Sequence, residues 1–247
     1  MCLGWFMSRS RDAPFRRAVL NLIVFLIFSV SLFPCVLFGW ALWCVWQCFL
    51  SMFLQWWVGV LLLPFAFYLV FAFCVMSVIV VSGWIIRLFR LYYEPGVFEY
   101  CFADDMTWRW LLVCSLYTPC RKLMEMFPVG PVKNYYYRLL GMKIGEESLI
   151  GGAIKDPCLT EVGKKCTIGE YAVIYGHIHT VADGSLLMQK VVIGNRCVIG
   201  AGALVMPGAV LEDEVVVAAG SVVRKGQVLK SGGVYGGVPA KKISSKS

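Results

Sequence analysis

The chain has 247 residues, a hydrophobic content of 59% and a formal net charge of +8. Its mean hydropathy of +0.72 is too high for a single soluble globular domain. No basic stripe with interleaved aromatic residues occurs in the C-terminal half, which argues against a nucleic-acid partner. Contact with anionic lipid explains the positive charge instead.

Residues 18–86 form a run of 69 residues without Asp, Glu, Lys or Arg. Because a membrane span needs roughly 20 apolar residues, the run predicts two spans, at about 19–42 and 58–84. Three spans would be more cramped. The tryptophan-rich link at 43–57 suits a membrane–water interface. We expect residues 1–90 to form a basic tail and a two-span membrane hairpin.

Arginines flank this run on both sides, which fixes its expected orientation. The positive-inside rule places both flanks in the cytoplasm, and this requires an even number of crossings. We therefore expect an integral protein of the cell membrane, with both termini and the C-terminal half in the cytoplasm. The flanking residues are Arg9, Arg11, Arg16 and Arg17 before the run, and Arg87 and Arg90 after it.

Residues 91–140 change in character and form a predicted interfacial linker. The spacing of Trp108, Leu111 and Leu112 predicts an amphipathic helix up to Phe127, lying on the inner membrane face. Pro128, Gly130 and Pro131 are expected to end it. A second short amphipathic segment is predicted at 135–140.

From residue 141 to 243 the chain repeats every six residues. This period fits neither an α-helix at about 3.6 residues nor a strand at 2. It is expected of a triangular solenoid with one hexad on each side and three hexads in each turn. The inward positions are predicted at Ile144, Ile150, Asp156, Val162, Ile168 and Ile174, then one residue late at Ile193, Ile199, Val205, Leu211, Val217, Val223 and Leu229.

Two irregularities interrupt the repeat. Asp156 stands where an aliphatic residue is expected, and with Pro157 it predicts a distorted early coil or a small loop. The frame is broken a second time at 180–190, which predicts a loop that projects from the solenoid.

The two histidines of the chain, His177 and His179, stand directly before the second break. Since they flank Ile178, both are expected on the same outward side of one short strand. Their position at this irregularity favours a general base over ordinary surface residues. A carboxylate normally orients such an imidazole, and the candidates are Asp183 in the loop and Asp156 or Glu161 on nearby coils.

The hexads, the Gly-His-Ile-His segment before a loop and the ending Gly-Gly-Val-Pro-Ala-Lys-Lys-Ile together resemble the hexapeptide-repeat acyltransferases of the isoleucine-patch class, in their membrane-anchored form. The resemblance covers about residues 135–243. It implies an N-terminal α-helical transmembrane hairpin followed by a C-terminal left-handed parallel β-helix. It also implies a homotrimer with active sites in the grooves between subunits, acetyl-CoA or another acyl-CoA as co-substrate, and no metal.

The resemblance also implies roles for particular residues. Membrane-type relatives would place the base at His177 and soluble sugar acetyltransferases at His179, so the choice between them stays open. Backbone of the later coils would hold the pantetheine arm of CoA, and lysines near the end would contact its phosphates. The matching residues are Ala201, Gly202, Ala219, Gly220, Lys225, Lys241 and Lys242.

The function that follows is an acyl-CoA-dependent O- or N-acyltransferase, an acetyltransferase by resemblance, which acts on a membrane-associated acceptor. A lipid-linked sugar and an envelope lipid or polysaccharide are the acceptor classes considered. One alternative is a non-enzymatic trimeric scaffold at the membrane, and another is a partner of a peptide-synthetase-like system. A zinc enzyme of the γ-carbonic anhydrase type would need three histidines, and the chain has two. Acyl chain length, and CoA or a carrier protein as donor, stay open.

Overall fold

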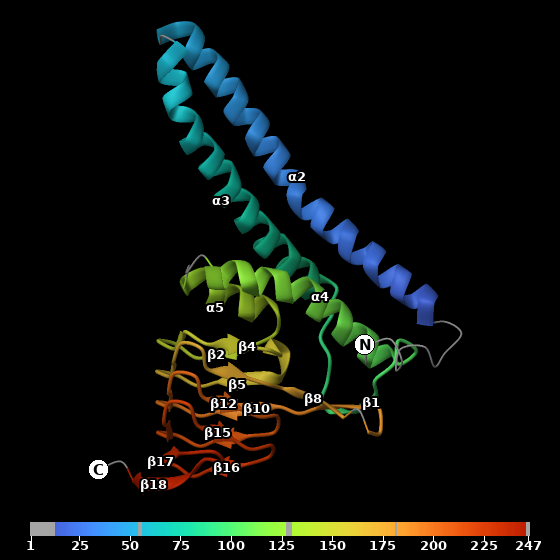
Figure 1. Ribbon diagram of the computed structural model, residues 1–247, viewed down its shortest axis with the longest axis vertical. Coiled ribbons are helices and arrows are strands. Elements are labelled where there is room, and N and C mark those ends of the chain that lie inside the picture. Colours follow the sequence, from blue (N-terminus) through green and yellow to red (C-terminus); the bar gives the residue numbers. More distant parts are fainter. Residues whose placement is uncertain (1–12, 54–55, 127–129, 181, 246–247) are drawn as a thin grey trace.

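The computed structural model describes residues 13–53, 56–126, 130–180 and 182–245. Two long helices, α2 (Ala13–Phe53) and α3 (Trp56–Leu88), form a hairpin that projects from the rest of the chain (Figure 1). Two segments of them, Pro14–Cys48 and Val60–Leu88, are long and apolar enough to cross a membrane. The predicted link at 43–57 is mostly helical, since α2 continues to Phe53. Residues 1–12, which include most of the predicted basic tail, lie outside the described residues.

A buried side-chain hydrogen bond joins the two helices of the hairpin. Ser77 Oγ donates this hydrogen bond to the carbonyl oxygen of Ser31, and the distance between the two oxygens is 2.5 Å. Between apolar helices a cross-helix hydrogen bond of this kind fixes their register.

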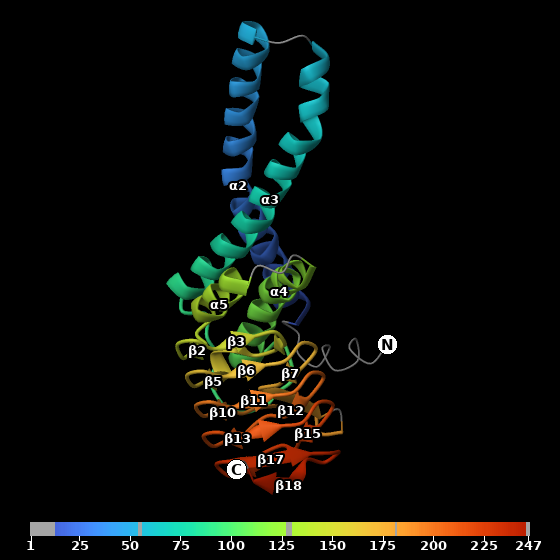
Figure 2. The same cartoon turned by 90° about the vertical axis from the view of Figure 1, so that its left-hand side faces the viewer.

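The linker contains β1 (Gly96–Glu99), α4 (Asp105–Met126) and α5 (Gly130–Leu139). Asp104 Oδ1 accepts a hydrogen bond from the Thr107 backbone N–H at 2.7 Å, which caps the start of α4. Gly130 and Pro131, expected to end a helix, begin α5 instead, because proline fits the first helical turn. Both helices pack between α3 and the first coil, as Figure 2 shows.

The remainder is a left-handed parallel β-helix with three sheets, as the hexads predict. The first sheet has β2 (Lys143–Ile144), β5 (Thr160–Val162), β10 (Val191–Ile193), β13 (Val210–Leu211) and β16 (Val228–Leu229). The second has β3 (Leu149–Ile150), β6 (Thr167–Ile168), β11 (Val198–Ile199), β14 (Val216–Val217), β17 (Gly233–Gly236) and the antiparallel β18 (Lys241–Ser245). The third has β4 (Ala153–Ile154), β7 (Val173–Ile174), β12 (Leu204–Val205) and β15 (Val222–Val223).

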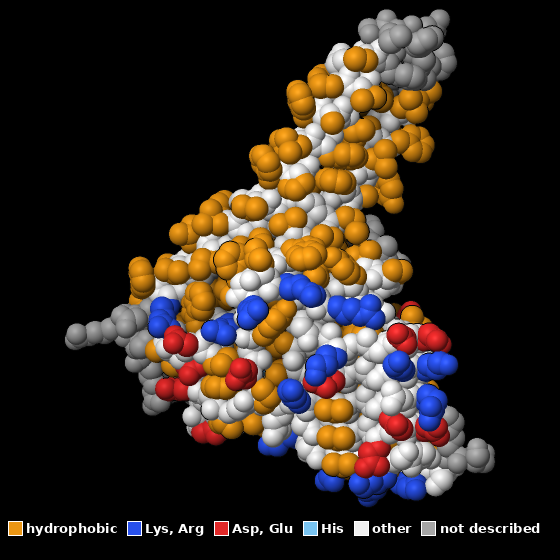
Figure 3. Space-filling model, turned by 180° about the vertical axis from the view of Figure 1, so that it is seen from behind, with side chains coloured by type: hydrophobic (Ala, Val, Ile, Leu, Met, Phe, Trp, Pro, Cys, Tyr) orange, Lys and Arg blue, Asp and Glu red, His pale blue; other side chains and the backbone are white. Residues whose placement is uncertain are grey.

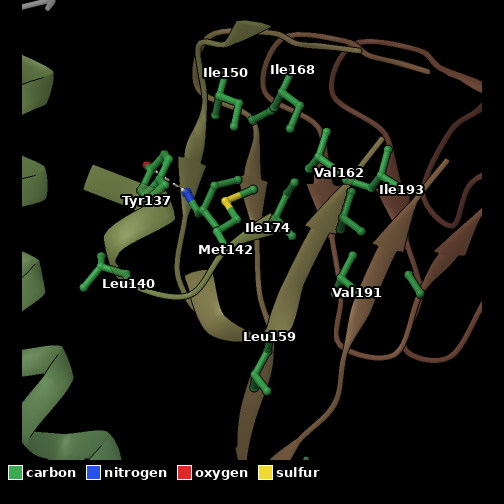
Figure 4. Packing of buried hydrophobic residues seen from close by; sticks show 14 of the residues in the cluster. Tyr137, Leu140, Met142, Ile150, Leu159, Val162, Ile168, Ile174, Val191 and Ile193 are labelled. Carbon is green, nitrogen blue, oxygen red and sulfur yellow. Dashed lines mark hydrogen bonds between the residues drawn. The ribbon is translucent and has the colours of Figure 1, made fainter. Parts of the chain in front are cut away.

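The strand register confirms the hexad frame over most of the solenoid. Ile193 pairs with Leu211 and Ile199 with Val217, each 18 positions on, so one coil takes three hexads. The paired aliphatic side chains are buried and stack along the axis (Figure 4). Burying each such side chain stabilises the fold by about 1.5–3 kcal/mol.

The hexad frame is wrong at Asp156. Ile154, not Asp156, pairs with Ile174 and takes the inward position of that side. A 3-10 turn, η1 (Pro157–Leu159), then absorbs the extra residues before β5. Asp156 is nevertheless fully buried, and its hydrogen-bond partners belong to the candidate active site.

The second break is a larger insertion than the one-residue shift suggests. Val162 pairs with Ile193, 31 positions on rather than 18, so this coil carries 13 additional residues, or two hexads and one more. They form an antiparallel hairpin of β8 (His177–Thr180) and β9 (Ser185–Met188). The linker strand β1 pairs with β9 and extends this hairpin to three strands.

The upper end of the solenoid is closed by α5 and the turn that follows it. Tyr137, Leu140 and Met142 are buried against the first coils (Figure 4). The Ile154 backbone N–H donates to the Tyr137 hydroxyl at 3.4 Å, and the Tyr117 hydroxyl of α4 donates to the Ile154 carbonyl oxygen. The linker helices thus satisfy backbone groups that the first coil would otherwise expose.

Candidate active site

Elements from three parts of the chain meet at the corner from which the β8–β9 hairpin leaves the solenoid. β8 supplies His177 and His179, and the first coil supplies Asp156 just before η1. Tyr93 comes from the segment after α3, and Trp110 from α4. The site is therefore shared between the solenoid and the linker.

The central contact joins His177 to Asp156, with 2.6 Å between Nδ1 and Oδ2. A carboxylate only accepts hydrogen bonds, so Nδ1 carries the proton. This tautomer leaves the Nε2 lone pair available to take a proton. Within the described residues, Nε2 has no hydrogen-bond partner. The His177 side chain is 14% exposed, so the ring is fixed by its hydrogen bond to Asp156 and part of it is still accessible to solvent.

Asp156 is fully buried and has a hydrogen-bond donor for each of its lone pairs. Oδ2 also accepts from the Gly176 backbone N–H at 2.8 Å. Oδ1 accepts from the Tyr93 hydroxyl at 2.9 Å and from Trp110 Nε1 at 3.2 Å. Burial raises the pKa of Asp156, but these hydrogen bonds and the charge of His177 outweigh it and lower the pKa overall. The group is therefore an anion at neutral pH.

His179 lies on the same face of β8 as His177, with 5.1 Å between the ring centroids. Its ring also meets Tyr100 and Trp110 edge-on, at 4.6 and 5.2 Å. Burial, and next the charge of His177, lower the pKa of His179. The outward face that carries both histidines is thus partly covered by the linker, because the Trp110 ring contacts both imidazoles edge-on.

The structure brings only one of the three suggested carboxylates to an imidazole. Asp183 lies exposed in the β8–β9 turn, where it accepts hydrogen bonds from the Ser185 backbone N–H and Oγ at 3.0 and 2.8 Å. Glu161 accepts from Lys143 at 2.9 Å. Asp156 therefore replaces Asp183 as the candidate that orients the base.

Two cysteines near this corner are poor nucleophiles. Burial raises the pKa of Cys158 to about 12, and burial also raises the pKa of Cys114 well above its usual range. A thiol attacks as its thiolate, so both are inactive at neutral pH. Over the described ranges, no three His, Cys, Asp or Glu side chains are grouped as metal ligands.

The residues expected to bind CoA occupy two different corners and the terminal strand. Ala201 and Gly202 stack on Ala219 and Gly220 at the corner before β12 and β15, where the Gly220 N–H donates to the Ala201 carbonyl oxygen at 2.9 Å. Lys225 follows β15, two coils below the corner that carries the histidines. Lys241 and Lys242 are exposed on β18. Of these residues, Lys225 shares a corner of the solenoid with His177, whereas the others lie at a different corner or on β18.

Sequence reasoning missed Tyr93 and Trp110, which hold Asp156. They lie 63 and 46 positions away from it along the chain. The one usable signal was a charged residue at an expected inward position, since a buried carboxylate needs donors from elsewhere. No pattern in the sequence identified which donors these are.

Residues 190–225 match the family described as bacterial transferase hexapeptide (six repeats). The matched residues lie within the coils of the left-handed β-helix that the hexads predict. No curated protein matches the chain.

Several solved structures are similar to part of this chain. A hexapeptide transferase family protein from Anaplasma phagocytophilum is 28% identical over 43% of this chain, with a TM-score of 0.34, and the chain spans only 56% of that protein. A maltose O-acetyltransferase from Clostridium difficile 630 is 21% identical over 62% of this chain and 94% of its own, with a TM-score of 0.45. A hexapeptide-repeat acetyltransferase from Vibrio cholerae O1 biovar eltor, complexed with acetyl coenzyme A, is 20% identical over 51% and 83%, with a TM-score of 0.44.

Proposed function

We propose that this protein is a membrane-anchored acyltransferase that moves an acetyl group from acetyl-CoA to a hydroxyl or amine of a membrane-associated acceptor. The observation that carries the proposal is the His177–Asp156 pair, built into the irregular corner of a transferase-type solenoid. An ionised carboxylate with all its hydrogen bonds made fixes the tautomer of the imidazole. A histidine with no role beyond the surface would not need a fixed tautomer.

His177 acts in this proposal as the general base. Its Nε2 takes the proton from the acceptor as the acceptor oxygen or nitrogen bonds to the thioester carbonyl carbon. The carbon–sulfur bond then breaks, and the CoA thiolate takes the proton back from the imidazolium. Asp156 stabilises the imidazolium while it exists and stays ionised throughout. Direct transfer is favoured because the nearby thiols are protonated.

Anchoring by the hairpin rests on exposure and on charge. In the apolar 18-residue stretch of each segment only 11% and 33% of the residues are buried within the chain, whereas the helices of a soluble core are mostly buried. Arg16 at the start of α2 and Arg87 at the end of α3 lie at the solenoid end of the hairpin. With two crossings, the positive-inside rule then places both termini and the solenoid in the cytoplasm.

A homotrimer is part of the proposal, and the third sheet supports it. The outward residues of its four strands are all aliphatic, which forms an apolar column unusual for a free surface. They are Ala153, Val173, Leu204 and Val222. Packing of copies along the Leu204 and Val222 part of this column would bring a second chain near the corner that carries His177.

The test uses the full chain, purified in detergent and incubated with labelled acetyl-CoA and a membrane lipid extract. We expect label in the lipid fraction and an equal amount of free CoA, measured by mass spectrometry. His177→Ala should abolish both, and His179→Ala separates the two candidate bases. Lys164→Gln, which changes an exposed side chain outside the candidate site, controls for effects of substitution and purification on activity. Absence of transfer together with absence of a thermal shift by CoA would favour the scaffold instead.

A further inference from the structure

A groove of about 610 Å³ opens between the linker helices and the first coils. Its lining comes from the end of α4, the start of α5, residues 149–153 of the first coil and residues on and around β7. Four basic side chains and two acidic ones line it. The basic residues are Arg121, Lys122, Lys133 and Lys155.

Two of these lysines have no carboxylate partner in the described part of the chain. Lys133 is 9% exposed, and its Nζ donates to the Gly151 carbonyl oxygen at 2.8 Å. Lys155 Nζ lies 5.8 Å from the centroid of the Tyr175 ring. Glu125, by contrast, is already paired with Arg121 and Lys122. Burial lowers the pKa of both Lys133 and Lys155, so an anion in the groove would relieve an existing cost.

The groove lies beside the end of the hairpin that packs on the linker helices. α4 and α5 pack on the end of α3, where Ser82 Oγ lies 3.4 Å from both Cys120 Sγ and the Tyr136 hydroxyl. Figure 3 shows basic side chains gathered where the hydrophobic surface of the hairpin meets the solenoid. Lipid headgroups occupy this depth if the hairpin spans the bilayer.

One end of the groove approaches the candidate active site. Tyr175 lines the groove, and its ring centroid lies 6.3 Å from that of His177. Lys155 directly precedes Asp156 in the chain. A molecule held by an anionic group in the groove would therefore present its neighbouring atoms to the base.

We propose that this groove binds the phosphate of a membrane lipid, and that this lipid is the acyl acceptor. The acceptor role depends on the proposed function, whereas the binding does not. Lys133 and Lys155 supply charged hydrogen bonds to the phosphate oxygens, and the apolar tails remain beside α3 in the bilayer. The acceptor class is thus narrowed from membrane-associated molecules in general to phosphate-bearing lipids.

The test measures binding of dihexanoyl phosphatidic acid to the full chain in detergent by native mass spectrometry. Dihexanoylglycerol, which has the same tails without phosphate, is the matched ligand control. Inorganic phosphate and CoA are separate arms. The variants are Lys155→Gln alone and Lys133→Gln with Lys155→Gln, and Lys164→Gln with Lys230→Gln changes the charge equally at exposed sites remote from the groove.

We expect phosphatidic acid to bind and dihexanoylglycerol not to bind. Lys155→Gln should weaken phosphatidic acid binding about tenfold, and the double groove variant more, because each charged hydrogen bond lost has about this effect. The remote pair should bind as the wild type does. Because Lys133 also bonds to Gly151, the single Lys155 variant keeps the test valid if the double variant unfolds.

Three outcomes would overturn the proposal. Equal binding by the wild type and Lys155→Gln removes the groove as the site. A loss of CoA affinity with unchanged phosphatidic acid binding assigns the groove to the phosphates of the co-substrate, and inorganic phosphate binding as tightly as the lipid excludes a lipid-specific site. His177→Ala should still bind phosphatidic acid, so absence of acyl transfer by the wild type, with groove-dependent lipid binding intact, refutes the enzyme and not the lipid site.

Discussion

Replacing Asp156 by Asn tests the orienting carboxylate, because the side chain keeps its size and loses two acceptor sites. Four donors converge on the carboxylate: the Gly176 N–H, the Tyr93 hydroxyl, Trp110 Nε1 and His177 Nδ1. An Asn amide retains one carbonyl oxygen, so two donors lose their partner. Each buried unsatisfied group costs about 1–3 kcal/mol, which lowers the free energy of unfolding by about 2–6 kcal/mol.

The same change should lower kcat for acyl transfer by about 10⁴-fold, as expected when an orienting carboxylate no longer fixes the imidazole tautomer. KM for acetyl-CoA should change little, since Asp156 is buried and contacts no solvent. The assay is initial-rate CoA release by the full chain in detergent, at a temperature where circular dichroism shows the variant folded. A folded Asp156→Asn variant with wild-type kcat would refute the orienting role.

The pH dependence of stability gives an independent readout of Asp156. Its pKa is lowered in the folded chain, so the unfolded chain binds its proton more strongly. The carboxylate therefore stabilises the fold above the ordinary Asp pKa of about 3.9, and this stabilisation is lost as the pH falls through the lowered value. Urea unfolding of Asp156→Asn should lack this acid-side loss. An identical acid-side loss in the wild type and the variant would contradict the assignment.

Three other predictions concern the surroundings of the site and the hairpin. Tyr93→Phe and Trp110→Phe each remove one donor to an ionised carboxylate, so each should lower the free energy of unfolding by about 1.5–3 kcal/mol and reduce kcat less than removal of the carboxylate. Full activity of both variants would argue against the hydrogen-bond network. Because the pKa of His179 is lowered in the folded state, protonation favours the unfolded chain as the pH falls below about 6.5, and His179→Gln should flatten urea stability between pH 7 and 5. Gly83→Val should destabilise the chain by about 1–3 kcal/mol, since a Cβ there would lie 2.9 Å from buried side chains of α5, whereas Gly39→Val has open space; equal thermal stability of the two variants would contradict this packing.

The solenoid could be predicted because each hexad records a local requirement. An aliphatic side chain must point inward on every side of every coil, and Ile193, Ile199 and Val205 do so with uniform spacing. The hexad frame failed at Asp156 because the inward residue after Ile150 comes early, at Ile154, and the next comes late, at Val162. The two irregular spacings together still span two hexads, so the sequence on either side keeps its frame. Only the pairing of Ile154 with Ile174 reveals this.

The candidate site could be predicted only in part. The histidines stood out because they adjoin a break in a regular repeat, and the break proved to be a 13-residue insertion. Their partners could not be assigned, since contact between Trp110 and Asp156 depends on how α4 docks on the first coil. The basic groove was equally hidden, because Lys133 on α5 and Lys155 on the first coil line one groove only when α5 packs on that coil.

The pairing of β1 with the histidine hairpin has a practical consequence for anyone who wishes to work with a water-soluble fragment. A truncation that starts at Gly141 would retain every coil and both imidazoles, yet it would lose Tyr93, Tyr100, Trp110 and the edge strand Gly96–Glu99. In such a fragment the apolar upper end of the solenoid would be exposed. Asp156 would lose the hydrogen bonds from Tyr93 and Trp110. Removing the linker together with the membrane hairpin would therefore also remove half of the candidate active site.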